Sequence, residues 1–156
     1  MGLFDKIRSS VSSASKNERY TPLSDYEAWV GMLYAAIAAD GEVSEVEIDA
    51  LIRLVLFKNK FTGLDIIPFY KNALQAKNQF GIQHIIDSCS LLIKDDDKPT
   101  LLALVAELIL SDGIITDKEK EVIEYITARL NIDEPTAAKI IEVMLIKNKD
   151  NRVFLN

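Results

Sequence analysis

Two short stretches of the chain carry the residue types that bind hard divalent cations. Residues 39–47 read ADGEVSEVE and residues 111–119 read SDGIITDKE, so the pattern Asp-Gly-x-[Val/Ile]-[Ser/Thr]-x-x-Glu occurs twice, 72 positions apart. Ca²⁺ and Mg²⁺ favour carboxylate oxygens, so we expect either of them rather than Zn²⁺ if an ion binds. The candidate metal ligands are Asp40, Glu47, Asp112 and Glu119.

A purely structural reading accounts for part of this pattern. The glycines can take the left-handed conformation that ends a helix, and Ser44 and Thr116 fit the N-cap of a following helix. The glutamate three residues later would complete a capping box. Nothing in helix ending requires Asp40 or Asp112, although either could form an Asx-type bond to the turn. The acid spacing is not that of an EF-hand. The sequence thus leaves a shared metal site and well-capped turns as alternatives.

Helices must position these acids, because the apolar residues recur at three- and four-residue spacing with no alternating strand pattern. We predict an all-α, single-domain bundle of about seven helices with an internal pseudo-two-fold duplication, repeat one at about 25–76 and repeat two at about 97–148. The domain would span 23–150, after a segment and linker over 1–22. The predicted helices begin after a cap at Ser24 or Asp25 and cover about 25–39, 44–57, 66–76, 80–93, 98–111, 117–130 and 135–147.

The N-terminal segment has a pattern of its own. Residues 3–11 place Leu3, Phe4, Ile7 and Val11 on one stripe, which predicts a short amphipathic helix. Residues 1–20 carry four basic and two acidic side chains, a net charge of +2. Such a helix could contact a membrane surface, a groove on a partner, or its own bundle.

Composition excludes several classes of protein. The whole chain has a net charge of -6, so residues 21–156 carry -8, which argues against nucleic-acid binding through phosphates. No apolar run reaches the ~20 residues that span a bilayer, and no secretory signal is recognisable. The single cysteine, Cys89, fits a reducing cytoplasm. Phosphate-loop, nucleophile-elbow and zinc-protease motifs are absent, and His84 is the only histidine, so we do not expect an enzyme.

The paired motif resembles the TerB-type tellurite-resistance family over about residues 25–145, and residues 1–7, MGLFDKI, are similar to how such chains begin. The resemblance implies a bacterial protein of tellurite resistance and chemical stress responses. It implies an acidic, metal-linked module that binds protein partners near the inner membrane, rather than an enzyme. On this chain the motif acids are Asp40, Glu47, Asp112 and Glu119. The alternative is a membrane-surface adaptor or scaffold that uses residues 3–11 and has no metal site.

Overall fold

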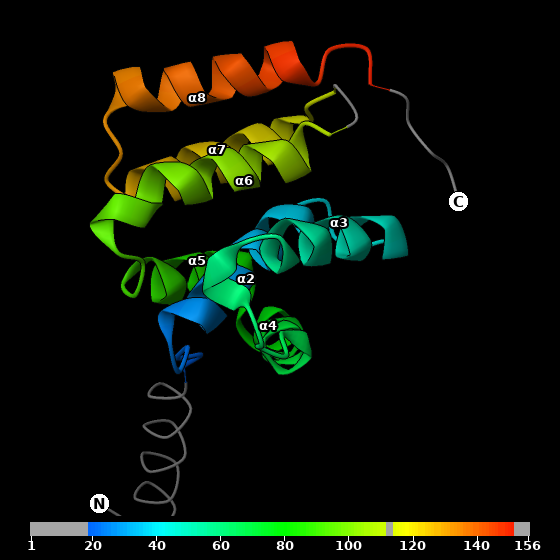
Figure 1. The fold of residues 1–156 in the computed structure, drawn as a ribbon, viewed down its shortest axis with the longest axis vertical. Helices are drawn as coiled ribbons and strands as arrows, with labels where there is room; N and C mark the ends of the chain where they lie inside the picture. Colours follow the sequence, from blue (N-terminus) through cyan, green and yellow to red (C-terminus); the bar gives the residue numbers. More distant parts are fainter. Residues whose placement is uncertain (1–18, 112–113, 152–156) are drawn as a thin grey trace, which may run out of the picture.

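The computed structural model describes residues 19–111 and 114–151, and these residues form a helical bundle without strands (Figure 1). The prediction of an all-α protein with about seven helices is confirmed. The α-helices are α2 (Asp25–Ile37), α3 (Glu45–Leu56), α4 (Ile67–Phe80), α5 (Ile82–Ser90), α6 (Lys98–Ile109), α7 (Asp117–Arg129) and α8 (Glu134–Lys147), with short 3-10 helices η1 (Asn59–Phe61) and η2 (Asp95–Asp97).

Helix starts follow local chemistry. The Ser24 side chain accepts a hydrogen bond from the backbone N–H of Glu27 at the start of α2, which satisfies one of the donors that a helix N-terminus leaves unpaired. Asp133 caps α8 in the same way through Thr136. Proline occupies the first turns of α4, α6 and α8, where its missing N–H costs nothing.

The core is built around two helices, α2 and α6, which pack against each other. Helix α2 also packs on α4 and α5, and it is buried along its length from Glu27 to Ala38. Helix α6 packs on α7 and α8, which lie with it in the upper part of the molecule in Figure 1, whereas α2 to α5 form the lower part. Helix α5 bridges the two parts through contacts with α2, α4 and α7.

Some boundaries differ from the sequence prediction. The third helix of the described bundle continues to Phe80, and the next begins only at Ile82 and ends at Ser90. Gly81 separates them with φ +86, a conformation that costs glycine little. Helices α6 and α7 follow α2 and α3 at about the 72-residue offset of the two motifs. The internal duplication itself stays a prediction.

The end of the predicted linker packs on the bundle. Tyr20 is buried, and its backbone N–H donates a hydrogen bond of 3.0 Å to Nε2 of His84. His84 stacks on Phe80, with 4.5 Å between ring centroids. The only histidine therefore holds residues 19–22 against α5. The predicted amphipathic helix at residues 3–11 lies outside the described residues.

Candidate functional site: two acidic corners

We name residues 39–47 corner one and residues 111–119 corner two. Corner one joins α2 to α3, and corner two joins α6 to α7. Because α2 and α6 pack together, the two corners lie close to each other. Oγ1 of Thr116 in corner two donates a hydrogen bond of 3.2 Å to Oδ1 of Asp40 in corner one. These residues are 76 positions apart in the sequence, and both are exposed.

The two glutamates of the motif cap helices. In corner one, Oε1 of Glu47 accepts from the backbone N–H of Ser44 at 3.1 Å, and Ser44 Oγ accepts in return from the N–H of Glu47 at 3.2 Å. In corner two the corresponding distances between Thr116 and Glu119 are 2.9 Å and 3.1 Å. Both capping boxes predicted from the sequence are confirmed, so each glutamate has a structural role.

The cap hydroxyls differ between the corners. Oγ of Ser44 donates to Oε1 of Glu47 at 3.0 Å, so the hydroxyl of this cap is used within corner one. Oγ1 of Thr116 donates to Asp40 instead. Asp40 therefore places an exposed carboxylate at the junction of the two corners.

The structure brings together only part of the predicted ligand set. Asp112 lies outside the described residues. Within the ranges that the structure describes, 19–111 and 114–151, no group of three or more His, Cys, Asp or Glu side chains is arranged to hold a metal ion. Asp40 is the predicted ligand whose carboxylate is joined to the opposite corner, whereas Glu47 and Glu119 face their own caps.

A lysine that sequence reasoning missed sits at corner one. Nζ of Lys77, from α4, donates a hydrogen bond of 2.6 Å to the carbonyl oxygen of Gly41. Its positive charge lies beside the residue that follows Asp40, so corner one is less acidic than its sequence suggests. No sequence signal could have shown this contact, because Lys77 and Gly41 are 36 positions apart and lysine is common at the end of helices.

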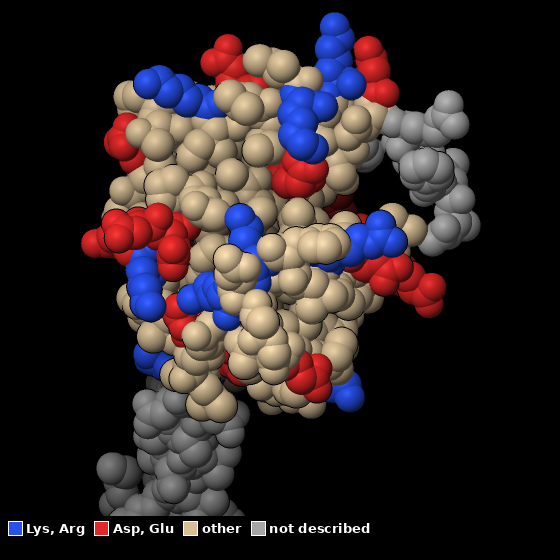
Figure 2. All heavy atoms as spheres, in the orientation of Figure 1, with Lys and Arg blue, Asp and Glu red and all other residues tan. Residues whose placement is uncertain are grey.

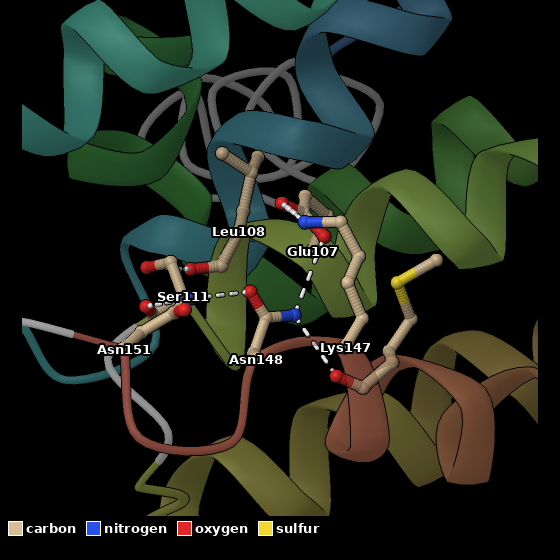
Figure 3. A network of polar contacts seen from close by, with 7 residues as sticks. Glu107, Leu108, Ser111, Lys147, Asn148 and Asn151 are labelled. Carbon is tan, nitrogen blue, oxygen red and sulfur yellow. Dashed lines mark hydrogen bonds and ion pairs between the residues drawn. The ribbon is translucent and has the colours of Figure 1, made fainter.

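A network of polar side chains from α6, α8 and the residues after α8 contacts corner two at Ser111 (Figure 3). Nζ of Lys147 lies 2.7 Å from Oε1 of Glu107, and Nδ2 of Asn148 donates to Oε2 of Glu107 at 3.3 Å. Nδ2 of Asn151 then donates to Oδ1 of Asn148 at 2.7 Å and to the carbonyl oxygen of Ser111 at 3.0 Å. Asn148 is 1% exposed. Glu107 is thus a partly buried, paired carboxylate, and the network fixes the chain at Ser111.

A buried acid that sequence reasoning also missed lies in the first turn of α2. Glu27 is 1% exposed, and its carboxylate accepts hydrogen bonds from Nδ2 of Asn72 at 3.0 Å and from the backbone N–H of Leu23 at 3.3 Å. The Ser24-x-x-Glu27 spacing is itself a cap signal, so it gives no hint of burial. Burial, with a smaller contribution from Glu27, raises the pKa of the Cys89 thiol well above its usual range. Cys89 is therefore a packing residue rather than a nucleophile.

The surface charge is mixed on the face shown in Figure 2, where acidic and basic side chains alternate rather than forming fields of one sign. Acidic side chains gather at the left edge, over the segment that leads into α6, where Asp95–Asp97 form η2. Lys98 pairs with Asp95 at 2.8 Å. Among the described residues, none of the helices has the length and apolar character needed to cross a bilayer.

The geometry defines a class: an all-helical bundle in which two acid-containing helix corners meet. A family model described as "Tellurite resistance protein TerB" matches residues 26–141. That match covers more than half of the chain, and the chain belongs to the tellurite resistance protein TerB family. No curated protein and no solved structure matches it.

Proposed function

We propose that the protein is an acidic module of tellurite resistance and chemical stress responses that binds a divalent cation, and through it a protein partner, at the joined corners. One observation carries this proposal: the hydrogen bond from Thr116 to Asp40, which joins corner two to corner one. The aspartate that helix ending does not explain is thus held at the junction of the two motifs. Its counterpart Asp112 belongs to the same motif in corner two.

The capping geometry refines the proposed ligand set. One carboxylate oxygen of Glu47 and one of Glu119 accept hydrogen bonds from the N-cap residues. We therefore propose that these glutamates position the corners and that Asp40 and Asp112 bind the ion. Two carboxylates from the protein leave most of the coordination sphere of Ca²⁺ or Mg²⁺ to water and carbonyl oxygens. The proposed site is therefore weak, with a Kd on the order of 10⁻⁴ to 10⁻³ M.

A bound cation would change what the surface offers to a partner. With the site empty, the exposed Asp40 carboxylate attracts a basic partner. With the site filled, the two positive charges of the ion balance the carboxylates of Asp40 and Asp112, and its remaining coordination positions are open to oxygen atoms of a partner. We further propose, from the family resemblance, that this module is not an enzyme and acts in the cytoplasm beside a partner at the inner membrane.

Calorimetric titration tests the cation-binding proposal. The full chain is titrated with Ca²⁺, Mg²⁺, Mn²⁺ and Zn²⁺, and the titrations are repeated on Asp40→Asn, on Asp112→Asn and on the double variant. We expect a loss of heat in each variant and a gain in affinity in Lys77→Gln, which removes the cation beside Gly41. Asp96→Asn, at the other end of α6 from corner two, is the matched control. No heat for any ion would end the proposal.

A further inference from the structure

An open groove runs between α7 and α8, and Ile115 of corner two is among the residues that line it. Both helices pack against α6, and the space between them, about 580 Å³, is floored by apolar side chains. Ile123 and Ile141 line it, and Leu145 lines it while remaining 45% exposed. A continuous apolar surface left open beside polar residues is typical of a protein interaction site.

The lining residues are spaced as a helical partner requires. On α8 they include Ala138, Ile141, Glu142 and Leu145, which recur at intervals of three, one and three residues and so share one face. On α7 they run from Lys120 to Ala128, nine residues or roughly 13 Å of helix. The groove is therefore an elongated channel between two helices, in which a third helix can lay an apolar stripe.

The rim of the groove is acidic. Three glutamates, Glu124, Glu134 and Glu142, line it together with one lysine, Lys120, which gives a net charge of -2. All four are exposed, so they select a partner by charge rather than by burial. The favoured occupant is a helix of about nine residues with an apolar stripe and basic residues beside it.

Residues 3–11 of this chain have that composition. Their stripe of Leu3, Phe4, Ile7 and Val11 is nine residues long, and Lys6 and Arg8 flank it. We propose that the groove binds residues 3–11 of a second copy of this chain. If two copies exchange these segments reciprocally, both grooves are filled and the assembly closes as a two-fold dimer.

The position of the segment's attachment favours a second copy over the same molecule. Arg19 and Tyr20, from which residues 1–18 extend, share a pocket with Gln75 and Gln79 of α4. In Figure 1, α4 lies at the opposite end of the molecule from α8. The segment thus starts at the end of its own molecule that is remote from the groove, whereas a neighbouring copy can present its groove directly.

Sedimentation equilibrium of the full chain tests the exchange. We expect a dimer whose Kd rises at least tenfold in Phe4→Glu, which changes the segment, and in Leu145→Glu, which changes the groove. Val143→Glu alters a 56% exposed residue of α8 that does not line the groove, and it should remain dimeric. Glu142→Lys should weaken the dimer, and adding Lys6→Glu should restore it, because opposite charges again face each other.

Three results would overturn the exchange. The first is a wild-type chain that stays monomeric at all concentrations. The second is a dimer that Phe4→Glu weakens while Leu145→Glu and Glu142→Lys leave it intact. The third comes from co-sedimentation with vesicles of phosphatidylglycerol and phosphatidylethanolamine: wild type binds them, Phe4→Glu does not, and self-association is equal in both. None of these readouts depends on cation binding, so this inference and the proposed function can fail separately.

Discussion

Helices α2 and α6 lie 72 positions apart and end in the same motif, but they are supported in different ways. Helix α2 is covered by α5, and Gly31 faces Cys89 and Ile85 of α5. The residue of α6 at the same offset is Ala103, which is only half buried. Ala35 of α2 is fully buried, whereas its counterpart Glu107 is paired with Lys147. Helix α2 is thus supported by close apolar packing, and the end of α6 by a polar network.

This difference shows that the same turn motif can form in two different structural environments. The capping boxes are the same in both corners and depend only on residues within each motif. The supports come from elsewhere in the chain: Lys77 of α4 for corner one, and Asn148 and Asn151 for corner two. The motif therefore sets the turn, and the surrounding helices set how rigidly the turn is held.

The largest expected effect concerns the contact between α2 and α5. A Cβ added at Gly31 would lie 2.6 Å from Sγ of Cys89 and 3.3 Å from the hydroxyl oxygen of Tyr20. Gly31→Ala should therefore destabilise the protein by about 2–3 kcal/mol, despite the better helix propensity of alanine. The converse change at the equivalent position, Ala103→Gly, should cost at most about 1 kcal/mol. Urea unfolding monitored by circular dichroism measures both.

A second change at Cys89 shows whether the clash is the cause. Cys89→Ala removes the sulfur atom, so Gly31→Ala should cost less in that background than in the wild type. Equal costs in both backgrounds would mean that α5 does not press on α2 at this point, and the contrast between the two helices would lose its basis.

The next effect concerns the polar network at corner two. Asn148→Ala removes hydrogen bonds to Glu107, to the carbonyl oxygen of Met144 and from Asn151. Because Asn148 is buried, we expect a loss of about 1–2 kcal/mol. Lys77→Ala at corner one removes one exposed hydrogen bond and should cost at most about 0.5 kcal/mol.

Hydrogen exchange separates a local effect from a global one. In Asn148→Ala the amides of residues 114–119 should exchange faster than those of residues 41–47, because only corner two loses its support. If both corners lose protection equally, or if Lys77→Ala is as costly as Asn148→Ala, the two corners are not supported differently.

A smaller effect distinguishes the two caps. Ser44→Ala should cost about 1 kcal/mol, the usual value for an N-cap. Thr116→Ala should cost about 0.5 kcal/mol more, because it also removes the donor to Asp40. Thr116→Ser keeps the hydroxyl and should cost little. A double-mutant cycle between Thr116→Ala and Asp40→Ala measures the coupling directly, and a coupling of zero would show that the corners are adjacent but independent.

Sequence reasoning reached the local features and missed the long-range ones. The helices and the capping boxes follow from spacing and residue type, because each depends on neighbours within one or two turns. The family assignment follows from the paired motif. The hydrogen bond between Thr116 and Asp40 could be predicted only by knowing that α2 and α6 pack against each other. The spacing of apolar residues does not show which helices pack together.

The buried position of Glu27 shows the same limit. Its spacing from Ser24 is that of an exposed helix cap, and only the packing of Asn72 and the segment at Leu23 turns that cap position into an interior one. The contact of Lys77 with Gly41 could not be predicted either, because the sequence does not show which way a lysine at the end of α4 faces. The hydrogen bonds within a motif can be predicted from adjacent residues. The charged groups that surround the motif come from residues far away in the sequence and cannot be predicted in this way.

The smallest effect contrasts the starts of α2 and α6. Burial raises the pKa of Asp25, but its hydrogen bond and ion pair with Lys60, and the more distant Lys94, outweigh burial and hold that pKa below its usual value. A lowered carboxyl pKa contributes stability that is present above about pH 4 and is lost as pH falls through the folded-state pKa. Lys60 also lies 4.4 Å from the centroid of the Tyr26 ring.

Lys60→Gln should therefore lower the free energy of unfolding at pH 7 by less than about 1 kcal/mol. Part of that difference should disappear as the pH is lowered from 4 toward 2, because the protonated Asp25 no longer attracts Lys60. The part due to the aromatic contact should persist at low pH. Asp97→Asn, at the equivalent position before α6, is the control. A difference that does not change with pH would assign the role of Lys60 to the rings of Tyr26 and Trp29, which its Nζ faces, rather than to Asp25. The two helix starts would then differ in packing alone.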